Sequence, residues 1–180
     1  MVVQIRAVDM DGAGLPGMTP IATLERNAFD PPIATGAPSV ADGASSLEIP
    51  CDKHLYVRMW DPNLQRFANN FYELLPGSGQ VSAPMEVVMA PAACFEVTLT
   101  GPGGQPAANE NIGLMMFHPT EGAWWPAEAN TDNHGRVRFA SVPPGRYRLK
   151  IKALKSGEAE VAEAILPPGA ATDLGTVTLE

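Results

Sequence analysis

Two adjacent tryptophans are the residues of this chain with the clearest potential for recognition. Trp124 and Trp125 stand in a segment bounded by Gly122 and Pro126, where strand-like alternation sends one ring inward and the other toward solvent. An exposed indole can anchor a protein partner or stack on a sugar ring. Both rings could instead pack over the open end of a domain. The pair therefore predicts a partner-binding surface, protein or glycan, with core packing as its structural alternative.

Groups that could perform catalysis are sparse. The histidines are His54, His118 and His134, and a Ser-His-Asp set could be imagined from Ser141, His134 and Asp132. No nucleophile elbow accompanies them, so a Ser-His-Asp assembly has no motif behind it. The sequence predicts no catalytic residue and a protein that is not an enzyme. A small hydrolase is kept as an alternative.

Acidic residues in the first turn region suggest calcium as the metal to consider. Asp9 and Asp11 precede Gly12, and Asp42 or Asp61 could complete an oxygen-rich cage. The spacing lacks the acidic residue that closes an EF-hand loop, and Asx turns use aspartates in the same way. Asp9, Asp11 and Asp42 are weak calcium candidates, and no cofactor is predicted.

The two cysteines leave two alternatives open. Cys51 precedes a strand-like run in the first half of the chain, and Cys94 opens such a run in the second half. A disulfide between them would join the halves, whereas two buried free thiols are the commoner role for such cysteines. No CxxC pair or zinc-type spacing is present.

The elements that must position these residues are β-strands. TDNHGRVRF at 131–139 and PPGRYRLKI at 143–151 alternate apolar with basic residues, which is the period of a strand buried on one face. Turn signals separate the strands, and Gly135 is predicted to take a positive φ. Residues 63–75 carry a weak helical spacing and are predicted to form either a helical turn or two, or a loop and a strand.

These two phrases resemble the carboxypeptidase regulatory-like and collagen-binding-B-like families of prealbumin-type β-sandwiches. The resemblance covers about residues 93–180, while the first half has IPCDKH in place of the Pro-Pro-Gly turn. It implies a β-sandwich that serves as a stalk, spacer or accessory unit. Enzymes with prealbumin-like folds use iron-binding Tyr and His sets or a His-Arg-His set, and these residues are not in register here. A hydrolase on this scaffold is therefore only an alternative.

The order of strands and turns repeats once along the chain. Runs at 3–7, 47–49, 55–59 and 85–89 correspond to runs at 95–99, 137–139, 147–151 and 175–179. The prediction is an all-β protein of two tandem Ig-like or prealbumin-like antiparallel β-sandwiches, with domain 1 at 1–91 and domain 2 at 92–180. The seam around APAA is short, so a stiff joint is expected.

The acidic balance excludes several partners. A net charge of -8 opposes binding to nucleic acid or an anionic membrane, and no apolar stretch is long enough for membrane insertion. The basic residues at 136, 138, 146, 148 and 150 are expected to solvate an outer face, with an anionic partner as the alternative. The sequence begins without a signal peptide, which predicts a surface or secreted protein if a leader was removed, and otherwise a cytoplasmic or particle-associated one.

Together these features predict a non-catalytic structural or protein-protein binding module, an attachment or spacer component of a larger assembly. A carbohydrate-binding accessory module using Trp124 and Trp125 is the first alternative.

Overall fold

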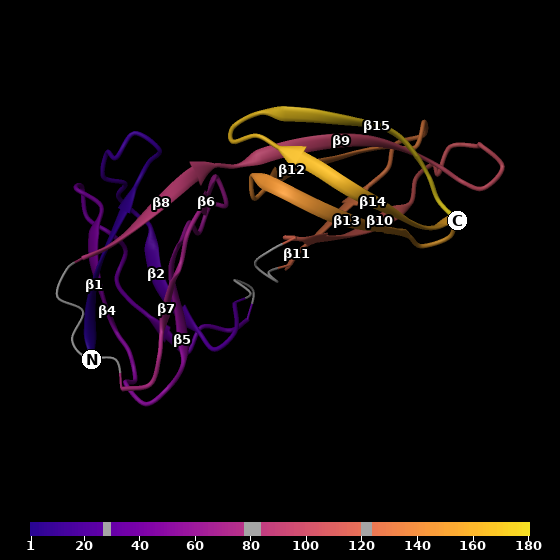
Figure 1. Ribbon diagram of the computed structural model, residues 1–180. Helices are drawn as coiled ribbons and strands as arrows, with labels where there is room; N and C mark the ends of the chain where they lie inside the picture. The colour runs from indigo at the N-terminus through magenta and orange to yellow at the C-terminus, as the bar shows by residue number, and fades with distance from the viewer. Residues whose placement is uncertain (27–29, 78–83, 120–123) are drawn as a thin grey trace. The chain divides into compact units, whose positions relative to one another are not determined.

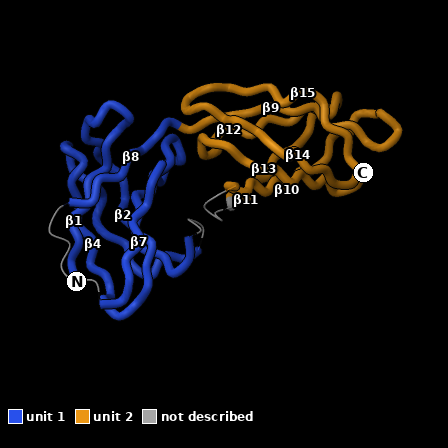
Figure 2. The backbone as a smooth tube through the Cα atoms, viewed as in Figure 1, with its two compact units in different colours: residues 1–91 blue, residues 92–180 orange. Residues whose placement is uncertain are grey.

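The computed structural model describes residues 1–26, 30–77, 84–119 and 124–180, and these form β-strands joined by turns (Figure 1). The chain divides into two compact units, Met1–Pro91 and Ala92–Glu180 (Figure 2). Within the described ranges no helix occurs that could cross a membrane. The all-β prediction is confirmed.

Unit 1 is a sandwich of two four-stranded sheets. One sheet has the order β4 (Ala44–Glu48), β1 (Val2–Val8), β8 (Met85–Pro91), β6 (Arg66–Ala68). The other has the order β3 (Ala34–Thr35), β2 (Thr19–Thr23), β5 (Leu55–Trp60), β7 (Tyr72–Leu74). Alternate residues from both sheets fill the core between them, among them Ile5, Leu47, Val57, Met59 and Val87.

Unit 2 is a sandwich of a four-stranded and a three-stranded sheet. The first has the order β11 (Trp124–Asn130), β10 (Asn111–Phe117), β13 (Gly145–Ala153), β14 (Gly157–Leu166). The second has the order β12 (Arg136–Val142), β9 (Ala93–Thr100), β15 (Ala171–Thr178). The predicted alternation is confirmed, because the apolar residues at 137, 139, 147, 149 and 151 are buried and the basic residues between them are exposed.

The two units share one topology. In each, the first strand pairs antiparallel with the strand after its long turn, β1 with β4 and β9 with β12. In each, the first strand also pairs in parallel with the last, β1 with β8 and β9 with β15. These parallel pairs are a difference from the purely antiparallel sheets expected from the sequence. β6, on the outer edge of β8, has no counterpart in the described part of unit 2.

The repeat extends to single hydrogen bonds. The Ser39 hydroxyl accepts the Met18 N–H at 2.9 Å and donates to the Leu15 carbonyl at 2.6 Å. The Thr131 hydroxyl makes the same two bonds in unit 2, with the Glu110 N–H at 2.9 Å and the Ala107 carbonyl at 2.6 Å. Each hydroxyl links the residue that precedes one strand to a residue in the preceding turn. Equivalent hydrogen bonds therefore stabilise both units.

The turn glycines are equivalent in the same way. Gly43 and Gly135 have φ values of 84° and 77°, which confirms the positive φ predicted for Gly135. The Ala7 N–H donates to the Gly43 carbonyl at 2.9 Å, and the Leu99 N–H donates to the Gly135 carbonyl at 2.8 Å. The long turn of each unit is thereby fastened to the first strand.

The segment 63–75 is not helical. Asp61 accepts the backbone N–H groups of Asn63, Gln65 and Arg66 through its carboxylate at 2.9–3.0 Å. Leu64 has a φ of 54°, outside the helical region. These bonds form a local turn in place of a helical one, and β6 and β7 follow it. The helical alternative is wrong, and the loop-and-strand alternative holds.

Both cysteines are free thiols, and neither is fully buried. Cys51 is exposed in a bend before β5, and Cys94 is half-buried on β9 between the buried Ala93 and Phe95. Cys94 therefore lies on the outer side of its strand, because successive residues point to opposite faces. The interpretation as buried thiols is wrong, and the disulfide alternative is not formed.

Candidate functional site

The tryptophan pair lies at the start of β11, an edge strand of unit 2. Trp125 pairs with Met116 of β10, which pairs with Leu149 of β13. All three side chains are buried, and Trp125 is only 8% exposed. Trp125 is therefore part of the core and offers little surface to a protein or sugar.

Trp124 belongs to the neighbouring register row of the same sheet. Its main chain pairs with Phe117, and Phe117 pairs with Arg148. Phe117 is half-buried beneath the Arg148 guanidinium, which lies 5.1 Å from the ring centre in a cation–π arrangement. The Trp124 side chain itself is outside the described part of the chain. The row nevertheless places an aromatic side chain on β10 and a cationic one on β13, the two strands next in order after β11.

The basic residues at 136, 138, 146, 148 and 150 of β12 and β13 are paired with acidic neighbours. The pairs on β13 and β14 join Arg146 to Glu163 at 2.9 Å, Arg148 to Glu160 at 3.5 Å and Lys150 to Glu158 at 3.7 Å. Glu96 of β9 pairs with Arg136 and, at 3.8 Å, with Arg138. Exposed pairs of this kind stabilise by about 0–1 kcal/mol each. Because carboxylates already face these cations, the expectation of a solvated outer face fits better than an anionic partner.

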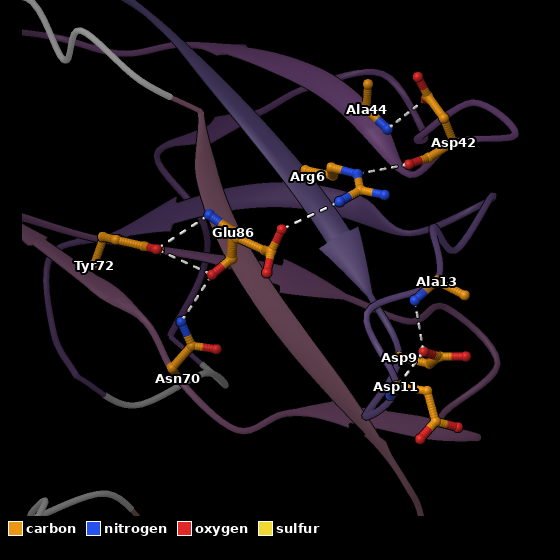
Figure 3. Close-up of polar contacts among 9 residues, drawn as sticks. All are labelled: Arg6, Asp9, Asp11, Ala13, Asp42, Ala44, Asn70, Tyr72 and Glu86. Carbon is orange, nitrogen blue, oxygen red and sulfur yellow. Dashed lines mark hydrogen bonds and ion pairs between the residues drawn. The ribbon is translucent and has the colours of Figure 1, made fainter.

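The aspartates considered for calcium form local turns (Figure 3). One Asp9 carboxylate oxygen accepts the N–H groups of Asp11 and Ala13 at 3.0 and 2.9 Å. Asp42 accepts the N–H of Ala44 at 2.9 Å. Within the described ranges no three His, Cys, Asp or Glu side chains are grouped so as to hold a metal ion. Asp9, Asp11 and Asp42 therefore do not form a calcium cage, and Asx turns account for Asp9 and Asp42.

The histidines are not brought together for catalysis. His118 follows β10 and contacts the Tyr147 ring, with centroids 5.8 Å apart. His134 lies in the turn after β11, at the other end of the β10–β11 pair. Asp132 uses its carboxylate to accept the N–H groups of Arg136 and His134. Those bonds, that of Arg136 first, lower the pKa of Asp132. The hydrolase alternative gains no support from this arrangement.

Glu110 is a buried carboxylate that the sequence analysis did not single out. Its side chain accepts the backbone N–H groups of Lys155 and Ser156 at 2.9 and 3.1 Å, and also the Ser156 hydroxyl. The hydroxyl bond is the main cause that lowers the pKa of Glu110, against the opposing effect of burial. The charged carboxylate thus holds the β13–β14 turn. Only the tertiary structure brings these residues together, so no sequence signal marked them.

We expect Glu110→Gln to destabilise unit 2 by about 1.5–3 kcal/mol at neutral pH, because a charged acceptor of three hydrogen bonds is lost. The folded-state pKa is lower than the unfolded one. The stabilisation is therefore complete above about pH 4.5, the ordinary pKa of a glutamate, and is lost as the pH falls through the folded pKa.

Urea unfolding of both proteins between pH 7 and pH 3 measures this difference. The exposed Glu128→Gln is the matched control and should unfold as the wild type does. If the free energy of unfolding of Glu110→Gln changed with pH as that of the wild type does, the assigned role would be contradicted.

No family model matches the chain, and no curated protein matches it. Solved structures that resemble it include a Streptococcal ancillary pilin, with a TM-score of 0.49 and 13% identity over 97% of this chain and 61% of that one. This chain thus spans less than two thirds of that pilin. GBS52, a minor pilin of Streptococcus agalactiae, has a TM-score of 0.49 and 10% identity, over 98% of this chain and 94% of that one. The shaft pilin spaA from Lactobacillus rhamnosus GG has a TM-score of 0.40 and 8% identity, over 100% and 98%. Similarities at this level do not assign the chain to a family.

Proposed function

We propose that this chain is a non-catalytic structural module of two tandem β-sandwich domains, which acts as an attachment or spacer component of a larger assembly. The observation that carries the proposal is the repeated topology: equivalent strands of the two units pair in the same order, and equivalent turns make the same hydrogen bonds. One residue, Ala92, separates β8 from β9. So short a connection suits a spacer. Membership of unit 2 in the carboxypeptidase regulatory-like or collagen-binding-B-like families is part of this proposal, and for unit 1 the resemblance is weak.

The protein-binding surface in this proposal is the β11 edge at Trp124. Two features support it. Burial of Trp125 leaves the opposite face of the strand to its neighbour, because successive side chains alternate. The paired Phe117 and Arg148 add aromatic and cationic surface in the same row. Large aromatic and arginine side chains are the residues that most often dominate protein interfaces.

Trp124→Ala should weaken binding of the partner by roughly 2 kcal/mol while the unfolding midpoint stays unchanged. Immobilised wild-type protein and variant would be exposed to an extract of the native source, and the retained proteins compared by mass spectrometry. The exposed β13 variant Arg146→Ala, outside this row, is the control and should retain the same partners as the wild type. Equal retention by Trp124→Ala, or a large loss of stability in it, would count against the site.

A further inference from the structure

We propose that Asp11 is a site of spontaneous modification, at which aspartate rearranges to isoaspartate through a cyclic imide, whereas the fold protects Asp42 from the same reaction. The sequence contains two Asp-Gly dipeptides, Asp11-Gly12 and Asp42-Gly43. This dipeptide favours the rearrangement because glycine has no Cβ to hinder attack by its backbone nitrogen. The two sites are chemically alike, so a difference in their reactivity must come from their surroundings in the folded chain.

The reaction needs only the chain and water. The Gly12 nitrogen bonds to the side-chain carboxyl carbon of Asp11 in its acid form, and the carboxyl hydroxyl leaves as water with the proton of that nitrogen. Water then adds to either carbonyl group of the imide ring. Addition at the side-chain carbonyl restores aspartate. Addition at the main-chain carbonyl gives isoaspartate, in which the main chain runs through Cβ and Cγ and is longer by one methylene group.

Asp11 lies at the exposed tip of the turn that follows β1. The base of this turn is held by the Asp9 N–H, which donates to the Ala13 carbonyl at 2.8 Å. The Asp11 N–H donates to the Asp9 carboxylate at 3.0 Å (Figure 3), but the Asp11 carboxylate itself makes no hydrogen bond or ion pair within the described ranges. A Cβ added at Gly12 would meet nothing within 4 Å. The carboxyl group and the nitrogen that must meet therefore have room to rotate.

Asp42 is held by hydrogen bonds on both sides of its peptide bond to Gly43. The Ala44 N–H donates to the Asp42 carboxylate, and the Arg6 side chain donates to the Asp42 carbonyl, both at 2.9 Å (Figure 3). The Gly43 carbonyl accepts the Ala7 N–H at 2.9 Å. Closing an imide ring rotates the Asp42 carboxyl group and the peptide plane that follows it, so these bonds would have to break.

The glycine nitrogens themselves do not distinguish the two sites. Each N–H donates to the carbonyl three residues earlier, at 3.1 Å for Gly12 and 2.8 Å for Gly43. Packing does distinguish them, because a Cβ added at Gly43 would lie 2.0 Å from the Ala7 carbonyl oxygen. The second dipeptide is therefore pressed against β1, whereas the first projects from the end of that strand.

The repeat shows that this reactivity is confined to unit 1. In the equivalent turn of unit 2, the Gly101 N–H donates to the Gln105 carbonyl at 2.9 Å, as the Asp9 N–H does to Ala13. Gly103 stands in the place of Asp11, so the carboxyl group that would form the imide is missing from that turn.

The modification would disturb the turn in which it occurs. One Asp9 carboxylate oxygen accepts the N–H groups of Asp11 and Ala13 at 3.0 and 2.9 Å. Isoaspartate inserts its extra methylene group between those two N–H groups. The Asp9 carboxylate could then not accept both of them in the present geometry, and the Asx turn would be lost.

The test follows both dipeptides in one sample of the folded full chain. The protein is incubated for several weeks in weakly acidic heavy-oxygen water, because the acid form of the carboxyl group is the one that loses water. Each passage through the imide leaves a heavy oxygen atom in the residue. Tryptic digestion places Asp11 in the peptide 7–26 and Asp42 in the peptide 27–53. Fragment masses then locate the label, and electron-transfer dissociation distinguishes isoaspartate from aspartate.

We expect Asp11 to take up label at least about tenfold faster than Asp42, because each hydrogen bond that must break at Asp42 slows the reaction by a few-fold to about tenfold. In guanidinium chloride, where the fold is lost, the two sites should react at similar rates. Asp11→Glu keeps the charge and should end label uptake in the peptide 7–26, since glutamate would need a larger ring that closes far more slowly.

Equal rates at Asp11 and Asp42 in the folded chain would overturn the proposal, as would uptake at Asp11 only after unfolding. A difference in rate that persists after unfolding would also overturn it, because local sequence and not the fold would then be the cause. Continued uptake in the 7–26 peptide of Asp11→Glu would place the reaction at Asp9 instead.

Discussion

Gly135→Ala is expected to destabilise unit 2 by about 3 kcal/mol or more, from two additive causes. Gly135 has a φ of 77°, where a side chain costs about 1–2 kcal/mol. A Cβ atom at this position would also lie 2.4 Å from the Leu99 carbonyl oxygen and 3.1 Å from the Ala107 nitrogen. The Ala107 N–H donates a hydrogen bond to the Leu99 carbonyl at 3.0 Å, and the Leu99 N–H donates to the Gly135 carbonyl. Relieving the clash would therefore disturb the hydrogen bonds that Leu99 of β9 makes to two turns.

Gly104 is a matched control in the same unit. Its φ of 78° is nearly that of Gly135, but an added Cβ meets nothing within 4 Å. Gly104→Ala should therefore cost only the conformational part, about 1–2 kcal/mol. Denaturant unfolding of both variants separates strain from steric overlap. Equal midpoints for the two variants would show that the close approach at Gly135 is not what restricts that position.

Trp125→Ala is expected to cost about 3–5 kcal/mol of stability through the cavity it leaves in the core of unit 2. The indole is 8% exposed, in register with the buried Met116 and Leu149. Thermal unfolding measures the loss directly. Trp125→Phe keeps most of the apolar volume and should lose clearly less.

Fluorescence quenching gives a second readout for Trp125. In the Trp60→Phe and Trp124→Phe background, Trp125 is the remaining indole, and iodide should quench it weakly because little of it is exposed. Strong quenching together with an unchanged melting temperature would place Trp125 on the surface, and the core assignment would be wrong.

The strands and turns of this protein could be predicted because their signals are local. Tyr147, Leu149 and Ile151 alternate with basic residues, and the structure buries these three on one side of β13. Gly135 could be assigned a positive φ from its turn alone. Period and turn chemistry depend on neighbours a few residues away, so the sequence by itself determined an all-β chain in which one order of strands recurs.

Contacts between distant segments could not be predicted in the same way. The parallel pairing of β1 with β8 and of β9 with β15 joins the two ends of each unit. The carboxylates that face Arg146, Arg148 and Lys150 come from a neighbouring strand whose register is shifted by a bulge. Local alternation defines the two faces of a strand but not its partner or its register.

The candidate sites follow the same division. The sequence determined that one ring of the Trp124–Trp125 pair should point inward, and the tertiary structure decided that Trp125 is the buried one. Glu110 became a structural carboxylate only where the β13–β14 turn meets it.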